Sequence, residues 1–221
     1  MLSIPTLGYG AGTAKYAGFN HNNDGSEIII DLVNQTAEAL ELGFNHLDLA
    51  EMYGNDREMG LALKKFLSSP SGASTSRNDL WITSKVYQNM HRPISACQEI
   101  VGRVGCQYLD LYLLHAPIAF RKTSLDIPAV HQDINYASIW SEMEQLVEMG
   151  LVRHIGVSNF RRSDLEELLP LCKIKPIINQ VEFNPYLQQP VLQKYCEEHG
   201  IKMAAYCPLG IILIISYNYT H

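Results

Sequence analysis

The stretch FNHLDLAEMYGNDREMGLALKKFL, residues 44–67, contains one strand signal followed at once by one helix signal. Its first part, residues 44–50, is a short apolar run with the length of a buried strand. Its second part, residues 55–67, repeats apolar side chains three and four positions apart, as on one face of a helix. The stretch therefore predicts a strand–helix unit in which the helix covers a parallel strand.

The same pairing recurs along the chain. Further strand-like runs lie at residues 6–12, 80–86, 108–115, 154–160, 177–183 and 201–207, and further helix-like stretches at 26–42, 93–105, 137–149, 162–170 and 190–199. Seven strands alternating with six helices predict an α/β fold with a parallel sheet. The regular rhythm favours a (β/α)8 barrel of the TIM type over a doubly wound open sheet. With about seven strands, such a barrel is incomplete.

Composition narrows the classes of partner and compartment. The net charge is −6 and no basic block is present, which argues against nucleic acid or an anionic membrane as a partner. The five cysteines are scattered and form no CxxC, which favours reduced thiols and no metal site. We see neither a signal peptide nor an apolar run that could span a bilayer. We expect a cytoplasmic protein, with a monomer as the default.

Four ionisable residues stand at or just after the ends of three consecutive predicted strands: Asp48, Tyr53, Lys85 and His115. Barrel enzymes assemble their sites from the C-terminal ends of several strands. Taken singly, each residue has an ordinary explanation, such as a turn cap, a packed ring, a solvated head or a hydrogen-bonded imidazole. Taken together, their positions predict one site, which we call the tetrad.

The tetrad has the groups that carbonyl reduction requires. A tyrosine hydroxyl is a weak acid, and a neighbouring lysine ammonium favours its ionised form. An aspartate keeps the lysine charged and oriented, while a histidine can hydrogen-bond a carbonyl oxygen. Such a set protonates an alkoxide as hydride arrives at the carbonyl carbon.

At these positions the chain resembles the aldo-keto reductase family. The resemblance rests on motifs in the family order and spacing, from Thr6 to Gly210: GFNHLDLAEMYGNDREMG (43–60), ITSKV (82–86), LLHAP (113–117), IGVSNF (155–160), INQVEFNPY (178–186) and AAYCPLG (204–210). It implies a (β/α)8 barrel, here a partial NADP-dependent oxidoreductase domain over residues 1–210. It also implies reduction of a small aldehyde or ketone with NADPH.

The resemblance also implies roles for particular residues. Asp48, Tyr53, Lys85 and His115 would be the catalytic residues, with Tyr53 as general acid. Cofactor contacts would come from residues of five strands: Gly12 and Thr13 from the first, Asp48 at the ribose, Ser158, Asn159 and Gln180 at the nicotinamide carboxamide, and Tyr206 stacked on its ring. Turn formation and core packing are the ordinary alternatives for Ser158, Asn159 and Tyr206.

Several positions depart from the family pattern. Asp56 replaces a usual glutamate, Leu49 a small residue and Cys207 a common serine, while Ala116 stands where many members have tryptophan, which widens the pocket. Residues 211–221, an atypical apolar tail, contain no lysine or arginine. We therefore expect a C-terminally truncated member that lacks the eighth strand, the last helices and the basic segment that holds the 2′-phosphate, with weaker binding of NADPH.

Two alternatives stay open at this point. The first is a catalytically inactive pseudo-reductase or regulatory binding protein, which truncation could produce. The second is a barrel lyase that uses Lys85 as a Schiff-base nucleophile. A paired aspartate counts against the second alternative, because it keeps the lysine protonated. The carbonyl substrate is not specified, since residues 118–136 and the absent C-terminal loop would select it.

Overall fold

The computed structural model describes residues 4–12, 28–117, 119–122, 128–131 and 135–210. Within these ranges, seven strands form one parallel sheet whose order follows the order of the chain. In sheet order the strands are β1 (Tyr9–Gly10), β2 (His46–Asp48), β3 (Trp81–Val86), β4 (Leu109–Leu114), β7 (Val152–Ser158), β8 (Ile178–Glu182) and β9 (Lys202–Tyr206).

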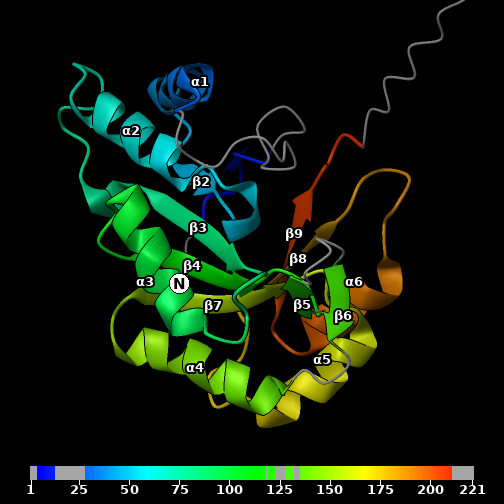
Figure 1. Cartoon of the computed structure of the whole chain (residues 1–221). Helices are drawn as coiled ribbons and strands as arrows, with labels where there is room; N and C mark the ends of the chain where they lie inside the picture. The colour runs from blue at the N-terminus through cyan, green and yellow to red at the C-terminus, as the bar shows by residue number, and fades with distance from the viewer. Residues whose placement is uncertain (1–3, 13–27, 118, 123–127, 132–134, 211–221) are drawn as a thin grey trace, which may run out of the picture.

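In the described part of the chain, six α-helices lie along the outside of this sheet, which curls into a half-barrel (Figure 1). They are α1 (Ile30–Glu41), α2 (Asp56–Leu67), α3 (Pro93–Val104), α4 (Tyr136–Glu148), α5 (Arg162–Leu168) and α6 (Pro190–Glu198). Short 3-10 turns are η1 (Glu51–Tyr53), η2 (Arg77–Asp79) and η3 (Leu169–Leu171). All seven strands and six helices predicted from the sequence are confirmed, and so is the barrel type.

Local sequence explains where these helices begin and end. Pro93 and Pro190 open α3 and α6 at a position where the missing N–H costs nothing. Gly105 ends α3 with a φ of 69°, a left-handed conformation that glycine adopts without strain. Because these helices begin and end outside the strands, the strand ends are free to carry polar side chains.

The hydrophobic core lies between the sheet and the helices. Every residue of β3 and β4 is buried, as expected for central strands of a covered parallel sheet. Trp140 of α4 is fully buried, and its indole N–H donates to the backbone oxygen of Ile174 at 2.9 Å. This packing makes the strand ends a rigid platform. Within the described ranges, no helix is long and apolar enough to cross a membrane.

One pair of strands was not predicted. Residues 118–136 were expected to be a long connection, and within them β5 (Ala119–Lys122) and β6 (Pro128–His131) form an antiparallel hairpin. The hairpin stands apart from the main sheet, after β4 (Figure 1). Its strands have four residues each, too few for their pattern to be read with certainty from sequence. The predicted tail, residues 211–221, lies outside the described residues.

Candidate active site

The predicted tetrad gathers at the C-terminal ends of β2, β3 and β4. Asp48 is the last residue of β2 and Tyr53 the last of η1, while Lys85 lies in β3 and His115 directly follows β4. Parallel pairing in register aligns these ends, with Asp48 beside Thr83 and Lys85 beside Leu113. The sheet therefore brings together residues that are up to 67 positions apart (115 − 48).

Lys85 is the centre of this group. Its side chain is 0% exposed, and its Nζ donates to Asp48 Oδ2 at 2.9 Å, to the Leu49 backbone oxygen at 2.9 Å and to Tyr53 Oη at 3.4 Å. An ammonium has three N–H donors, so each of them has an acceptor here. Satisfied hydrogen bonds of this kind are what make a buried charge tolerable.

The aromatic rings of the site are packed edge to face. The Tyr53 and His115 rings have centroids 6.0 Å apart at 83°, and Lys85 Nζ lies 5.1 Å from the centroid of the Tyr53 ring. Gly12 touches the same ring, because a Cβ at this position would lie only 2.4 Å from Tyr53 Cζ. Gly12 is therefore the residue type that leaves room for Tyr53.

His115 is held in its neutral form. Its pKa is lowered to about 3, mainly by burial and also by the nearby Lys85 ammonium, whose effect is larger than the opposite effect of the Asp48 carboxylate. At neutral pH its imidazole thus has one N–H donor and one lone pair. Its Nδ1 is buried and has no hydrogen-bond partner within the described residues.

The residues predicted to hold a nicotinamide lie beside the tetrad, at the ends of β7, β8 and β9. Ser158 Oγ donates to the Gln180 backbone oxygen at 2.8 Å, and Gln180 Nε2 donates to Asp48 Oδ2 at 3.3 Å. Tyr206 Oη donates to Asn159 Oδ1 at 2.9 Å, while Asn159 Nδ2 donates to the His115 backbone oxygen at 2.8 Å. These contacts link both predicted groups into one hydrogen-bonded network.

Asn159 has a backbone conformation that is unusual for its residue type. Its φ is 61°, and its N–H donates to the Gln180 backbone oxygen at 2.8 Å. Asparagine tolerates this left-handed region better than most residues do, and such strain collects at functional sites. Thr13, the remaining predicted cofactor residue, lies outside the described residues.

One acceptor in the site has no partner. Asp48 Oδ1 is buried and receives no hydrogen bond from any described residue, although Oδ2 of the same carboxylate receives two. A buried carboxylate oxygen without a donor is costly. A hydroxyl-bearing ligand such as a ribose would supply the missing donor, so the residues present fit the cofactor that the sequence implied.

Sequence reasoning missed two residues next to the tetrad. The Tyr87 ring packs against His115, with centroids 5.7 Å apart, and burial raises the pKa of its phenol. The Glu51 carboxylate accepts the Tyr87 N–H at 2.8 Å. Both residues lie in irregular segments where no periodic pattern marks a contact. The only available signal was an acidic residue two positions before the site tyrosine.

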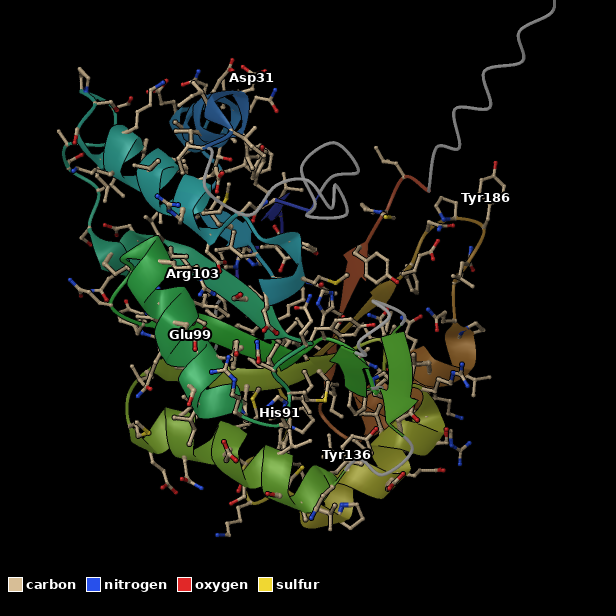
Figure 2. The ribbon with its side chains drawn as sticks, in the orientation of Figure 1. Asp31, His91, Glu99, Arg103, Tyr136 and Tyr186 are labelled. Atoms are coloured by element: carbon tan, nitrogen blue, oxygen red, sulfur yellow. The ribbon has the colours of Figure 1, made fainter. Side chains whose placement is uncertain are left out.

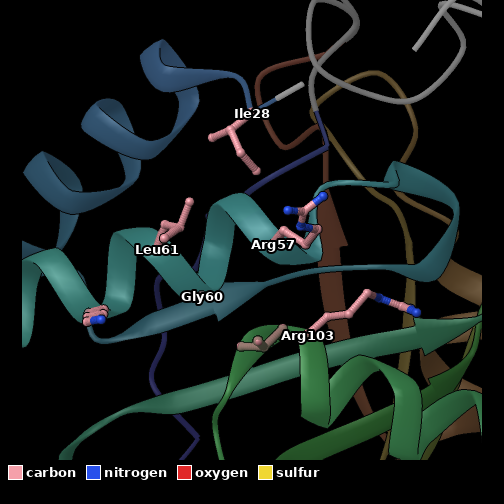
Figure 3. Close-up of a pocket in the computed structure, with 7 residues that line it drawn as sticks. Ile28, Arg57, Gly60, Leu61 and Arg103 are labelled. Carbon is pink, nitrogen blue, oxygen red and sulfur yellow. The ribbon is translucent and has the colours of Figure 1, made fainter. Parts of the chain in front are cut away.

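A separate pocket lies on the outside of the sheet, among the helices. It has a volume of about 310 Å³ and is lined by basic and apolar side chains that include Arg57, Leu61 and Arg103 (Figure 3). Arg103 is paired with Asp56 at 2.9 Å, and burial raises the pKa of that aspartate to about 6 despite the arginine. None of the residues that line this pocket belongs to the tetrad.

Comparison with known proteins identifies the relatives of this chain. The model of the aldo/keto reductase family matches residues 7–214. The chain is 38% identical to aldose reductase C of Dictyostelium discoideum over 94% of its own length and 64% of that protein's. It is 40% identical to the NAD/NADP-dependent indole-3-acetaldehyde reductase of Schizosaccharomyces pombe, over 94% of the chain and 66% of that protein. The chain therefore spans less than two thirds of either relative.

A solved structure of an aldo-keto reductase is also similar to this chain. The aldo-keto reductase of Bombyx mori, determined in complex with NADP, superimposes with a TM-score of 0.80 at 29% identity. The superposition covers 98% of this chain and 67% of that one. The half-barrel is thus similar to about two thirds of a complete reductase barrel.

Proposed function

Since the chain belongs to the aldo/keto reductase family, we propose that it reduces an aldehyde or ketone to an alcohol, with NADPH as hydride donor. Tyr53 is the general acid of this reaction. The observation that carries the proposal is the buried Lys85 ammonium, whose three N–H donors meet Asp48, Leu49 and the phenol oxygen of Tyr53.

The hydrogen-bond directions define the path of the proton. Because Tyr53 Oη accepts from Lys85, its own proton is free to be donated to a carbonyl oxygen. The phenolate that remains is stabilised by the ammonium 3.4 Å away. His115 is uncharged at neutral pH, so it can orient the same oxygen through a neutral hydrogen bond without competing as an acid.

The cofactor would be held at the ends of β2, β7, β8 and β9. Asp48 Oδ1, which has no partner among the described residues, is available to a ribose hydroxyl. Ser158, Asn159 and Gln180 offer hydroxyl and amide groups of the kind that bind a carboxamide, and the Tyr206 ring is available for stacking. When bound, NADPH supplies a hydride to the carbonyl carbon.

The lyase alternative is disfavoured by the same geometry. A Schiff-base nucleophile needs a free lone pair on its nitrogen, whereas Lys85 Nζ donates to three oxygens and is paired with Asp48 at 2.9 Å. Carbonyl reduction, in contrast, uses Lys85 as the hydrogen-bonded ammonium that this geometry holds.

The test is turnover of aldehydes by the 221-residue chain, followed through the loss of NADPH absorbance. Tyr53→Phe keeps the ring but removes the proton, so we expect kcat to fall by roughly 10²–10⁴-fold. Tyr186→Phe is a matched control, because Tyr186 is 97% exposed and lies in the loop between β8 and α6 (Figure 2). Equal activity of wild type and Tyr53→Phe would refute the assignment of the general acid.

A further inference from the structure

Glu51 makes a set of contacts that the catalytic assignment does not use. Its Oε2 accepts the N–H of Tyr87 at 2.8 Å and that of Asn89 at 3.3 Å, and its Oε1 accepts the side-chain amide of Asn89. Hydrogen bonds to an ionised carboxylate are about twice as strong as neutral ones. One side chain thus joins two segments 36 positions apart.

The turn that carries Tyr53 has few hydrogen bonds within its own backbone. It is the three-residue η1, none of whose residues is fully buried, and its first position has no side-chain cap. Its backbone bonds run from Tyr53 N to Ala50 O at 3.0 Å and from Gly54 N to Glu51 O at 3.2 Å. Single 3-10 turns have poor hydrogen-bond geometry and little stability of their own. The contacts of Glu51 therefore act together with the packing of the Tyr53 ring to hold this turn against the sheet.

We call Glu51 together with the groups that it binds on Tyr87 and Asn89 the Glu51 clamp. The end of this clamp at residues 87–89 lies next to the rest of the tetrad. Residues 87–89 follow β3 directly, so Lys85 lies two positions before the N–H that Glu51 binds. The Tyr87 ring packs on His115 at 5.7 Å and 66°. Tyr53, Lys85 and His115 are thus all adjacent, in sequence or in space, to a group that Glu51 holds.

The clamp continues into a ring of polar contacts. Asn89 Oδ1 accepts from Arg92 Nε at 2.9 Å, Arg92 pairs with Glu99 at 2.7 Å, and Glu99 lies 3.5 Å from Arg103. Figure 2 shows Glu99 and Arg103 on α3. Arg103 then pairs with buried Asp56, three residues after Tyr53. The exposed ion pairs in this ring contribute little to stability. The contacts of Glu51 and of buried Asp56 are therefore the ones that fix the chain before and after Tyr53.

We propose that Glu51 is a positioning residue for the reduction, because its carboxylate ties the turn of Tyr53 to the loop after β3 and thereby holds the phenol at Lys85 Nζ. The proposal rests on the function proposed above. A displacement of a catalytic group by about 1 Å is enough to slow a reaction by about two orders of magnitude. A purely structural role would instead affect only stability.

Glu144 provides a matched control. It is 5% exposed, lies in α4, and accepts two backbone N–H groups, of Lys173 at 2.6 Å and Ile174 at 2.8 Å. It therefore does for the loop between η3 and β8 what Glu51 does for the loop after β3, but no contact between it and the tetrad is present among the described residues. Glu144→Ala reports the cost of losing such a clamp without any effect on positioning.

The experiment compares Glu51→Ala, Glu51→Gln and Glu144→Ala in the full 221-residue chain. For Glu51→Ala we expect kcat to fall by roughly 10- to 100-fold while the Kd for NADPH stays about unchanged. Glu51→Gln, which keeps one acceptor oxygen, restores part of the rate. Glu144→Ala lowers thermal stability but leaves kcat as in wild type.

A second measurement does not depend on activity. With tyrosine labelled by ¹³C at Cζ, the NMR resonance of Tyr53 is identified by its loss in Tyr53→Phe. We expect it to move in Glu51→Ala and to stay in place in Glu144→Ala. An unmoved resonance, or equal loss of kcat in the two alanine variants, would overturn the proposal. If the wild type reduced no carbonyl, the proposed function would fail, and the resonance would still decide the role of Glu51.

Discussion

Lys85 determines the chemistry of the site at the scale of single residues. Its side chain is 0% exposed and its ammonium is shared by three oxygens, so any change that removes one of these contacts leaves a buried charge underpaired. The Asp48 carboxylate is the only charged acceptor among the three. In the proposed reduction, the proton of Tyr53 is thereby left for the substrate.

His115 provides a test by pH. Its folded-state pKa, about 3, lies below the ordinary value of 6.5, so between these values the unfolded chain binds more protons and stability rises with pH. We expect the wild type, relative to His115→Gln, to lose on the order of 2 kcal/mol of unfolding free energy between pH 6.5 and pH 5. Denaturant titrations at both pH values measure this difference. Equal pH dependence of the two proteins would contradict a neutral, buried His115.

The tetrad could be predicted from the sequence, whereas the Glu51 clamp could not. Asp48, Lys85 and His115 are tied to strand ends, and parallel strands of a barrel bring such ends to one face. Glu51 and Asn89 lie in irregular segments, 38 positions apart, whose meeting depends on loop geometry. The local pattern of apolar and polar residues in the sequence carries no information on such a contact.

At the scale of elements, α2 and α3 approach each other closely at Gly60. A Cβ on this glycine would lie 2.8 Å from the backbone oxygen of Arg103 and 2.9 Å from that of Val104. The helical periodicity predicted both helices, but not that they would touch through backbone. This contact sets the distance between the helix that follows Tyr53 and the helix that follows Lys85.

Gly60→Ala tests this contact. Because backbone atoms cannot yield as a side-chain end does, we expect a loss of roughly 1–3 kcal/mol in unfolding free energy. Gly102→Ala is the matched control, since a Cβ there meets nothing within 4 Å and alanine is the better helix former, by up to about 1 kcal/mol. Thermal or urea unfolding measures both. Equal shifts in the two variants would show that α2 and α3 are not in contact at Gly60.

The strands and the hairpin show which kinds of element can be predicted from the sequence. Long apolar runs such as those of β3 and β4 were recognisable because both faces are buried. Among the described residues, the four-residue strands β5 and β6 pair with each other and not with the main sheet, and each is too short for a periodic pattern. Element length and burial, rather than propensity, decided which elements could be predicted.

At the scale of the whole molecule, the two ends of the sheet differ from its middle. Among the described residues, β1 and β9 are the outermost strands, and no residue of β9 is fully buried, in contrast to β4. Strands with one neighbour open more readily than strands with two. Tyr206, which we propose as a cofactor contact, lies at the end of β9.

Amide hydrogen exchange tests this gradient. We expect the amides of Lys202–Tyr206 to exchange faster than those of Leu109–Leu114, because β4 has a paired neighbour on each side and β9 on one. NADPH should slow exchange in β9, since Tyr206 is proposed to contact it. Equal protection of β4 and β9 without cofactor would contradict the described order of the sheet.

The most direct test of the account is transfer of deuterium from [4,4-²H₂]NADPH to an aldehyde by the purified 221-residue chain. If the tetrad and the strand ends beside it form a reductase site, mass spectrometry will find one deuterium on the carbinol carbon of the alcohol, and Tyr53→Phe will lose nearly all of this product. A folded chain that yields no labelled alcohol from any aldehyde or ketone offered would contradict the proposed function.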